Sequence, residues 1–378
     1  MIPIFEPVIG EEEIDAVVAA LRRGEISGTY GRDLEKFENQ FAQYCGCEYG
    51  VAVTSGTTAL HLAVTAAGIR PGEEILLSAS TNIATALAIV HNNAIPVPVD
   101  SENETWNLNI DLIEPQITSK TKAIIPVHLF GHPVDMDWLN EIAHKHHLIV
   151  IEDCAESHGA TCRGVKTGSF GDMGCFSFYA NKIITTGEGG MVVTNDKKLC
   201  EKLKLLRNLA FTTPRFRHEY AGYNFRMTGY QAAMGLAQLK KIDQIIGEKR
   251  RIAHLYHKYL ENIPGLQLPV ELDWAFNVYW MYGVVVKPEF GMQRDQLIKI
   301  LAQKGVDTRT FFCPMNQQPC LQKIQGFREI SCPVADRLWE QGFYLPSSYT
   351  LSEENIRFIA DCINDAKNDQ KTDIYENK

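Results

Sequence analysis

The sequence predicts an α/β protein in which a large domain built on a mostly parallel sheet precedes a smaller α+β domain. From about residue 50 to residue 200, short apolar or β-branched runs such as EILLSA, IPVPVD and LIVIED alternate with helical patterns such as NIATALAIVHNN. This alternation is typical of β-α-β units around a parallel sheet. A long helical pattern then runs from about Gly229 to Leu260, and the break at Pro264 and Gly265 marks the end of the large domain.

The chain is expected to divide into three parts. Residues 1–262 hold two N-terminal helices, the sheet and the long connecting helix, and residues 263–366 form the smaller domain with the patterns VYWMYGVVV and QLIKILAQKG. Residues 367–378, KNDQKTDIYENK, are expected to form a flexible tail because they contain few apolar residues. The first two helices are joined by the turn EISGTYG, in which Thr29 and Tyr30 either form a simple connection or line a pocket for substrate.

The composition indicates an ordinary globular protein of 378 residues, of which 45% are hydrophobic and 22% charged. Its net charge of −9 gives no basic field of the kind that attracts nucleic acid or anionic membranes. No window approaches the roughly 20 apolar residues of a membrane span, and no signal peptide pattern opens the chain, so we expect a cytoplasmic protein. Ten cysteines are scattered without a C-x-x-C pair, which argues against a zinc site or a disulfide framework, and no metal site is predicted.

The stretch VAVTSGTTALHLAV predicts a strand that runs directly into a helix at Ser55, Gly56, Thr57 and Thr58. The first N–H groups of a helix have no partner within it, and the positive end of the helix dipole faces outward there. A phosphate group fits such a helix start. An ordinary Ser/Thr cap is the alternative reading of the same residues.

An acid and a lysine follow along the same domain. The apolar run LIVIED ends in Asp153, at the carboxyl end of a strand, where parallel sheets bind their ligands. Lys182 lies between the aromatic strand FSFY and the turn TTGEGG. An anion cradle, a buried acid and a lysine are what a pyridoxal phosphate enzyme needs as phosphate anchor, pyridinium partner and Schiff base. The motifs G-x-G-x-x-G, G-x-x-x-x-G-K-[ST], H-E-x-x-H and G-x-S-x-G do not occur, which argues against the chemistries that they serve.

The chain resembles the sugar aminotransferases of the DegT/DnrJ/EryC1/StrS family, which are fold type I pyridoxal phosphate enzymes. The resemblance covers nearly the whole chain and rests on the motifs FEPVIGEEE, SGTTALHLAV, VHLFGHPVDMD, VIEDCAESHGA, FSFYANKIITTGEGGMVVTND, YNFRMTGYQAAMGLAQL and FFCPMNQQP. It implies a mixed, mostly parallel sheet of seven strands in the large domain. The motifs GHPVDMD and NKIITTGEGGMVVTND are most similar to the members that aminate GDP-4-keto-6-deoxymannose to GDP-perosamine, a sugar of lipopolysaccharide O-antigens.

The resemblance also implies roles for single residues. Lys182 and Asp153 are the implied catalytic residues, as Schiff base and as partner of the pyridinium nitrogen. L-Glutamate is the implied amino donor, with pyridoxamine 5'-phosphate as the intermediate form of pyridoxal 5'-phosphate. A homodimer with shared active sites is implied as well. The implied cofactor contacts are Gly56, Thr57 and Ser177 at the phosphate, Glu156 near the ring hydroxyl, and Asn224 reaching the phosphate from the neighbouring subunit.

Contacts to the nucleotide-linked sugar are harder to assign. Arg217 in TTPRFRHEY and Arg309 in DTRTFF offer cations for a diphosphate, although a solvated loop and a structural role are the respective alternatives. Asn316 lies in the loop CPMNQQP, where the perosamine-forming members tend to carry histidine. Asn82 stands where relatives commonly carry an aromatic residue that stacks on the cofactor, so either another side chain stacks there or none does.

Three other functions compete with this interpretation. The first is an aminotransferase for a dTDP- or UDP-linked 4-keto-6-deoxy sugar. The second is a dehydratase that uses pyridoxamine phosphate, and it is weaker because those relatives replace the Schiff-base lysine by histidine, whereas Lys182 is present. The third is a regulatory protein, against which the acidic charge and the lack of a DNA-binding motif argue.

Overall fold

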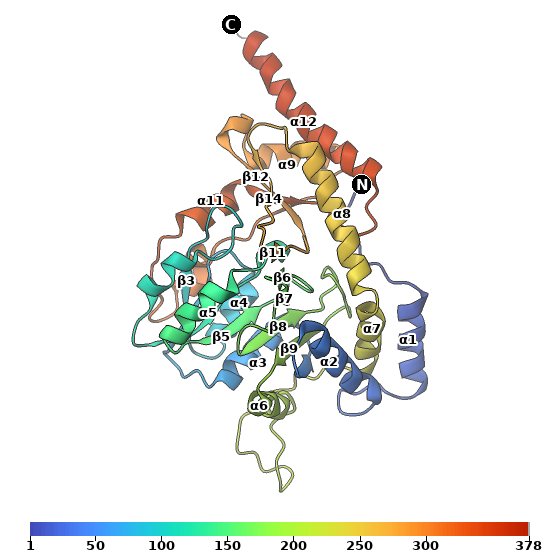
Figure 1. Ribbon diagram of the computed structural model, residues 1–378, viewed down its shortest axis with the longest axis vertical. Coiled ribbons are helices and arrows are strands. Elements are labelled where there is room, and N and C mark those ends of the chain that lie inside the picture. The colour runs from blue at the N-terminus through green and yellow to red at the C-terminus, as the bar shows by residue number, and fades with distance from the viewer. Residues whose placement is uncertain (377–378) are drawn as a thin grey trace.

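The computed structural model describes the backbone of residues 1–376 and the side chains up to residue 368 (Figure 1). Its centre is a sheet of seven strands, in which β9 is antiparallel to both neighbours and all other neighbouring pairs are parallel. This confirms the mixed, mostly parallel sheet. The strands lie in the order β1 (Tyr49–Val53), β9 (Gly190–Thr194), β8 (Met173–Ser177), β5 (Ile149–Asp153), β4 (Thr121–Ile125), β2 (Glu74–Ser78) and β3 (Ile95–Val99).

Both faces of this sheet are buried, which is why its strands are apolar throughout rather than alternating. Successive side chains point to opposite faces: Cys175 packs in one core and Phe176 in the other, against Phe37 and Phe41. The helices of the large domain are α1 (Glu11–Arg22), α2 (Arg32–Cys45), α3 (Gly56–Ala67), α4 (Ile83–Val90), α5 (Met136–Lys145), α6 (Lys197–Arg207) and α7 (Gly229–Leu239).

The smaller domain is built on an antiparallel sheet of four strands. Their order is β10 (Leu266–Gln267), β12 (Tyr282–Val286), β14 (Gly342–Leu345) and β13 (Arg309–Thr310). Its helices are α9 (Arg294–Gln303), α10 (Pro319–Gln322), α11 (Pro333–Gln341) and α12 (Glu353–Glu376). A further small sheet joins β6 (Thr161–Cys162), β7 (Val165–Lys166) and β11 (Ala275–Phe276), and 3-10 turns lie at Ile110–Leu112, Glu114–Gln116, Leu129–Gly131, Pro288–Phe290 and Met315–Gln317.

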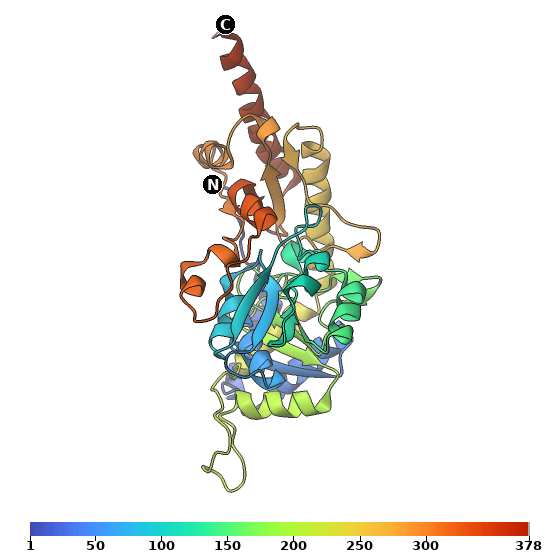
Figure 2. The ribbon, with the colours of Figure 1, turned by 90° about the vertical axis from the view of Figure 1, so that its left-hand side faces the viewer.

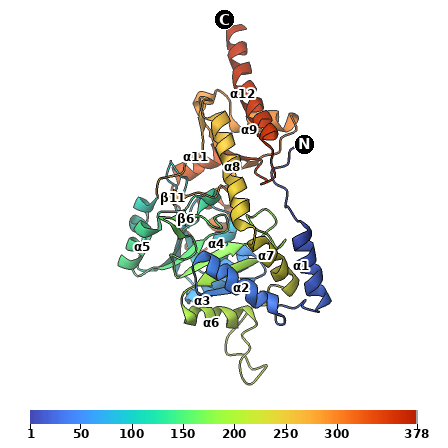
Figure 3. The same cartoon turned by 45° about the vertical axis from the view of Figure 1, so that its right-hand side comes forward.

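The long helix α8 (Ile242–Leu260) connects the two domains, as Figures 1 and 3 show from two sides. Ile245 and Ile246 in its first half pack in a core of the large domain. Tyr256 and Leu260 in its second half pack in the core of the smaller domain. The predicted boundary at residue 262 follows the end of this helix. Because α8 packs in the cores of both domains, it sets how the two domains are placed against each other.

The predicted tail from residue 367 onward continues α12 as far as Glu376, and residues 377–378 lie outside the described part of the chain. The segment contains neither glycine nor proline, so nothing in its sequence ends a helix. The Lys367 ammonium donates to the carbonyls of Glu289 (2.6 Å) and Phe290 (2.7 Å) and so ties this helix to the smaller domain.

Over residues 1–376, no helix combines the length and the apolar character that a membrane span requires.

Candidate active site

Six of the predicted site residues line one cavity of about 280 Å³. The cavity lies where strands β1, β5 and β8 end, because the carboxyl ends of parallel strands meet at one edge of a sheet. The loops that leave these ends bring together Gly56, Thr57, Asp153, Glu156, Ser177 and Lys182. Trp280, Phe312 and Tyr344 of the smaller domain complete the wall, so the cavity lies between the two domains.

The start of α3 forms an anion cradle at one side of this cavity. The Ser55 hydroxyl accepts a hydrogen bond from the Thr58 N–H (3.1 Å), and the Thr58 hydroxyl accepts one from the Ser55 N–H (2.9 Å). This capping leaves the first N–H groups of the helix available to a ligand. A Cβ on Gly56 would lie 2.6 Å from Cβ of Ser177, so only glycine lets α3 begin this close to β8. The arrangement fits a phosphate group.

Asp153 is buried at the end of β5 and is held by two hydrogen bonds. Its Oδ2 accepts from the Thr85 hydroxyl (2.8 Å), and its Oδ1 accepts from the Ala155 N–H (3.1 Å). Burial raises the pKa of Asp153, while these bonds and the charge of Lys182 act in the opposite direction. A cationic group on a ligand, such as a pyridinium, would form an ion pair with this carboxylate and stabilise its charge.

Lys182 lies in the loop between β8 and β9, with its ammonium nitrogen 3.8 Å from the centre of the Trp280 ring. Burial lowers the pKa of Lys182, and the charges of Glu156 and Asp153 oppose that shift. The indole N–H of Trp280 donates to the Asn181 carbonyl (2.7 Å). The Asn181 side-chain oxygen is buried without a partner among the described residues, and an orphaned acceptor at this position indicates room for a ligand donor.

Glu156 is the second buried carboxyl group of the cavity. It accepts a hydrogen bond from the Phe130 N–H (2.8 Å), and burial raises its pKa to about 7. Burial and this carboxylate raise the pKa of Tyr344 to about 12. The Tyr344 hydroxyl is therefore protonated throughout the neutral range, and the Glu156 carboxyl is protonated below about pH 7, where each offers an O–H donor to a ligand.

Trp280 is the residue that the sequence analysis missed. The pattern VYWMYGVVV indicates a strand of the smaller domain, but nothing in it shows which ring faces a lysine of the other domain. Asn82 also lines the cavity, yet its side-chain carbonyl accepts the Ala84 N–H (3.0 Å) as the cap of α4. The aromatic surface of the cavity comes from Trp280, Phe312 and Tyr344 of the smaller domain and from Tyr179 of the large domain.

Thr29 and Tyr30 line a separate cavity of about 330 Å³, together with Arg207 and Arg226. Arg207 pairs there with a glutamate of α2, whereas the Arg226 guanidinium donates to Asn208 (2.8 Å). Asn224 is exposed nearby and does not line the first cavity.

The remaining predicted substrate contacts do not line the first cavity. Arg217 is exposed on the loop between α6 and α7, which projects from the large domain in Figures 1 and 2. Arg309 of β13 pairs with Asp307, which precedes the strand. The amide of Asn316 donates to Asp336 (3.1 Å). None of these three residues therefore lines the cavity that contains Lys182.

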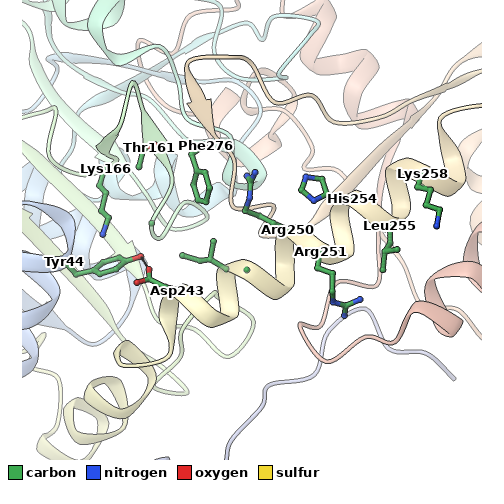
Figure 4. A pocket seen from close by; sticks show the side chains of 13 residues that line it. Tyr44, Thr161, Lys166, Asp243, Arg250, Arg251, His254, Leu255, Lys258 and Phe276 are labelled. Carbon is green, nitrogen blue, oxygen red and sulfur yellow. Dashed lines mark hydrogen bonds between the residues drawn. The ribbon is translucent and has the colours of Figure 1, made fainter.

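A wider hollow does not contain any predicted site residue. It is an open groove of about 890 Å³ along α8 (Figure 4). The Tyr44 hydroxyl donates to Asp243 (3.1 Å), the Lys166 ammonium lies 3.3 Å from the centre of the Tyr44 ring, and Arg250 pairs with Glu271 (2.5 Å). Since these charged and polar groups already have partners, we assign the groove no ligand.

Comparison with known proteins identifies the family. Residues 7–364 match the DegT/DnrJ/EryC1/StrS aminotransferase family. The chain belongs to this family. A GDP-perosamine synthase of Escherichia coli O157:H7 is 41% identical to this DegT-family protein over 98% of this chain and 99% of the relative. The dTDP-3-amino-3,4,6-trideoxy-alpha-D-glucose transaminase of Streptomyces venezuelae is 36% identical over 96% of this chain and 95% of the relative.

Solved structures confirm the fold type I architecture of this DegT-family protein. DesV of S. venezuelae, solved in complex with a ketimine intermediate, has a TM-score of 0.88 at 35% identity over 94% of each chain. A Streptococcus pneumoniae protein, 26% identical with a TM-score of 0.91, has been solved in a PLP form and a PMP form. The DegT-family chain is a sugar aminotransferase, and its cofactor is pyridoxal phosphate, which confirms the predicted family, enzyme class and cofactor.

Proposed function

We propose that this DegT-family protein transfers the amino group of L-glutamate to GDP-4-keto-6-deoxymannose and forms GDP-perosamine. The full-length similarity to three proteins named GDP-perosamine synthase, at 41%, 40% and 35% identity, is the observation that carries the proposal. A transaminase of a dTDP-sugar at 36% identity keeps a dTDP- or UDP-linked 4-keto-6-deoxy sugar as the second candidate. Dehydration is not favoured because Lys182 lines the cavity.

Pyridoxal phosphate, when bound, carries the amino group between the two substrates and delocalises the electrons of the broken C–H bond. The residues of the chain divide the remaining work. The first N–H groups of α3 and the Ser177 hydroxyl bind the phosphate, and the Asp153 carboxylate keeps the ring nitrogen protonated. The protonated carboxyl of Glu156 donates a hydrogen bond to the ring hydroxyl of the cofactor.

Lys182 moves the proton in both halves of the reaction. Because burial lowers its pKa, the Lys182 amine is more readily neutral, and Nζ can remove the α-proton of glutamate. In the second half, Nζ returns a proton to the carbon of the sugar that receives the amine. Trp280 and Tyr344 exclude water beside this nitrogen. Glutamate leaves as 2-oxoglutarate, so the two substrates react in turn at one site.

We also infer a cytoplasmic homodimer whose protomers share their active sites. Asn224 and the cavity at Thr29 and Tyr30 lie outside the Lys182 cavity of the same protomer, so a neighbouring protomer is needed if they contact cofactor or sugar nucleotide. The exposed Arg217 would then reach the diphosphate across the interface. Perosamine formation would place the protein in the synthesis of lipopolysaccharide O-antigens.

The test supplies the purified holoenzyme with L-glutamate and, in separate assays, GDP-, dTDP- or UDP-linked 4-keto-6-deoxy sugars. We expect the highest kcat/KM with GDP-4-keto-6-deoxymannose, with 2-oxoglutarate and amino sugar formed in equal amounts. Lys182→Ala should form neither product. Preference for the dTDP or UDP substrate would overturn the GDP assignment, and loss of water without amine formation would overturn amino transfer.

A further inference from the structure

Lys249 is a lysine of α8 that is only 2% exposed. Its ammonium donates to the Trp280 carbonyl (2.7 Å) and, over a shorter distance, to the Ser347 carbonyl. It pairs with no carboxylate within the part of the chain that the structure describes. A methionine of similar length would fill this place without the cost of burying a polar nitrogen, so the two hydrogen bonds are what the lysine adds over an apolar side chain.

The two carbonyls lie just outside the paired ends of β12 and β14, and Trp280 before β12 and Tyr344 in β14 both line the Lys182 cavity. Strands β12 and β14 pair with Tyr282 opposite Leu345, and continuing this register places Trp280 opposite Ser347. The ladder has ended there, and both carbonyls bond to Lys249 instead. The Tyr256 hydroxyl, from two turns further along α8, donates to the carbonyl of Pro346, the residue before Ser347 (2.9 Å). Side chains on one face of α8 therefore supply the hydrogen bonds that strand pairing no longer provides beyond the ends of β12 and β14.

The segment before β12 has an unusual backbone that needs such support. Tyr279 has a φ of 47°, in the left-handed region that bulky residues rarely adopt. Its N–H donates to the Asn277 side-chain oxygen (2.8 Å), and the Arg250 guanidinium donates to the Asn277 carbonyl (2.6 Å). Lys249 and Arg250, consecutive on α8, thus hold the carbonyls on both sides of Tyr279.

Trp280 links this fixed backbone to Lys182, because its side chain contacts the reacting amine. Its ring lies 3.8 Å from the Lys182 ammonium nitrogen, and its indole N–H donates to the carbonyl of Asn181, the residue before Lys182. Trp280 is 3% exposed, and its ring fills the space beside the lysine. A shift of the Trp280 backbone would therefore open one side of Lys182 to water.

We propose that Lys249 is a positioning residue: by holding the Trp280 carbonyl, it keeps the indole ring against the amine of Lys182. The proposal rests on Lys182 as the reacting amine, but not on the identity of the sugar nucleotide. Burial lowers the pKa of Lys249 to about 7. The hydrogen-bonding role does not require the charge, because a neutral amine still has two N–H groups for the two carbonyls.

In the experiment, cofactor-free protein is treated with an amine-reactive reagent over a series of pH values. Mass spectrometry of the peptide that contains Lys182 gives the rate of its modification at each pH. The plateau of the modification rate at high pH reports how accessible Lys182 is to the reagent. The pH at which the rate is half of this plateau reports the pKa of Lys182. We expect Lys249→Met to raise the plateau several-fold. Trp280→Phe should raise it as well, and Lys249→Met should add nothing in the Trp280→Phe background. Lys258→Met, at an exposed lysine of the same helix, should leave the profile unchanged.

A general loss of stability would act differently, since it would change the profile equally in both backgrounds. That outcome, or an unchanged profile in Lys249→Met, would overturn the proposal. Lys249→Gln keeps N–H donors and should lie between the wild type and Lys249→Met. If neither variant folds, Lys249 serves the scaffold as a whole and the proposal is wrong. In the holoenzyme, Lys249→Met should lower kcat of the glutamate half-reaction at unchanged KM.

Discussion

The Thr85 hydroxyl donates a 2.8 Å hydrogen bond to Oδ2 of Asp153, in the interior of the large domain. Thr85 is fully buried at the start of α4, and its oxygen lies 2.8 Å from that of Thr81. A helix start thus orients the carboxylate at the end of a strand. Hydrogen bonds to charged groups contribute about 1.5–3 kcal/mol, so this contact is strong enough to matter for Asp153.

Thr85→Val removes the hydroxyl and keeps the shape of the side chain. We expect the glutamate half-reaction of the holoenzyme to slow about tenfold, because Asp153 loses its orientation and part of the stabilisation of its charge. Stopped-flow measurement of the cofactor's visible band gives this rate. Thr65→Val serves as control, since the Thr65 hydroxyl bonds to the His61 carbonyl outside the cavity. Equal rates in wild type and Thr85→Val would show that Asp153 does not depend on this contact.

Gly56→Ala tests the anion cradle. The added Cβ would lie 2.6 Å from Cβ of Ser177, so the start of α3 must move away from β8. We expect affinity for pyridoxal phosphate to fall at least about tenfold, as measured by equilibrium dialysis. Gly247→Ala in α8 is the matched control, because its Cβ meets nothing within 4 Å and alanine favours the helix. Unchanged affinity in Gly56→Ala would place the phosphate elsewhere.

The sequence predicted those parts of the cavity that local patterns determine. Asp153 and Ser177 end strands, and Gly56 starts a helix after a strand, so the geometry of a parallel sheet suffices to bring them together. The sequence did not predict the roles of Trp280 and Lys249, because their contacts depend on how the smaller domain packs against α8. A lysine in an amphipathic helix is usually exposed, and no local pattern distinguishes the buried one.

Glu156 makes the stability of the cofactor-free protein depend on pH. Its pKa of about 7 in the folded protein lies above its ordinary value, so the folded state binds more protons between the two values. Stability therefore falls as pH rises through this window. Glu156→Gln keeps an acceptor for the Phe130 N–H and removes the titration.

We expect Glu156→Gln to gain free energy of unfolding, relative to wild type, between about pH 5 and about pH 8. Urea unfolding of the cofactor-free proteins at both pH values measures this difference. Glu141→Gln, at an exposed glutamate, is the control for the loss of a surface charge. A difference between variant and wild type that is equal at both pH values would contradict the raised pKa of Glu156.

Mixed dimers test whether Asn224 acts across a subunit interface. If each site combines Lys182 of one protomer with Asn224 of its partner, a dimer of Lys182→Ala with Asn224→Ala has one site that is intact and one that carries both substitutions. Random pairing of equal amounts makes half of the dimers mixed, so about a quarter of the wild-type activity should return. If Asn224 serves its own protomer, every site keeps one lesion and activity stays at the level of the separate variants. The measurement is turnover after joint refolding. Affinity capture of a tagged Lys182→Ala chain together with the untagged Asn224→Ala chain shows that mixed dimers have formed.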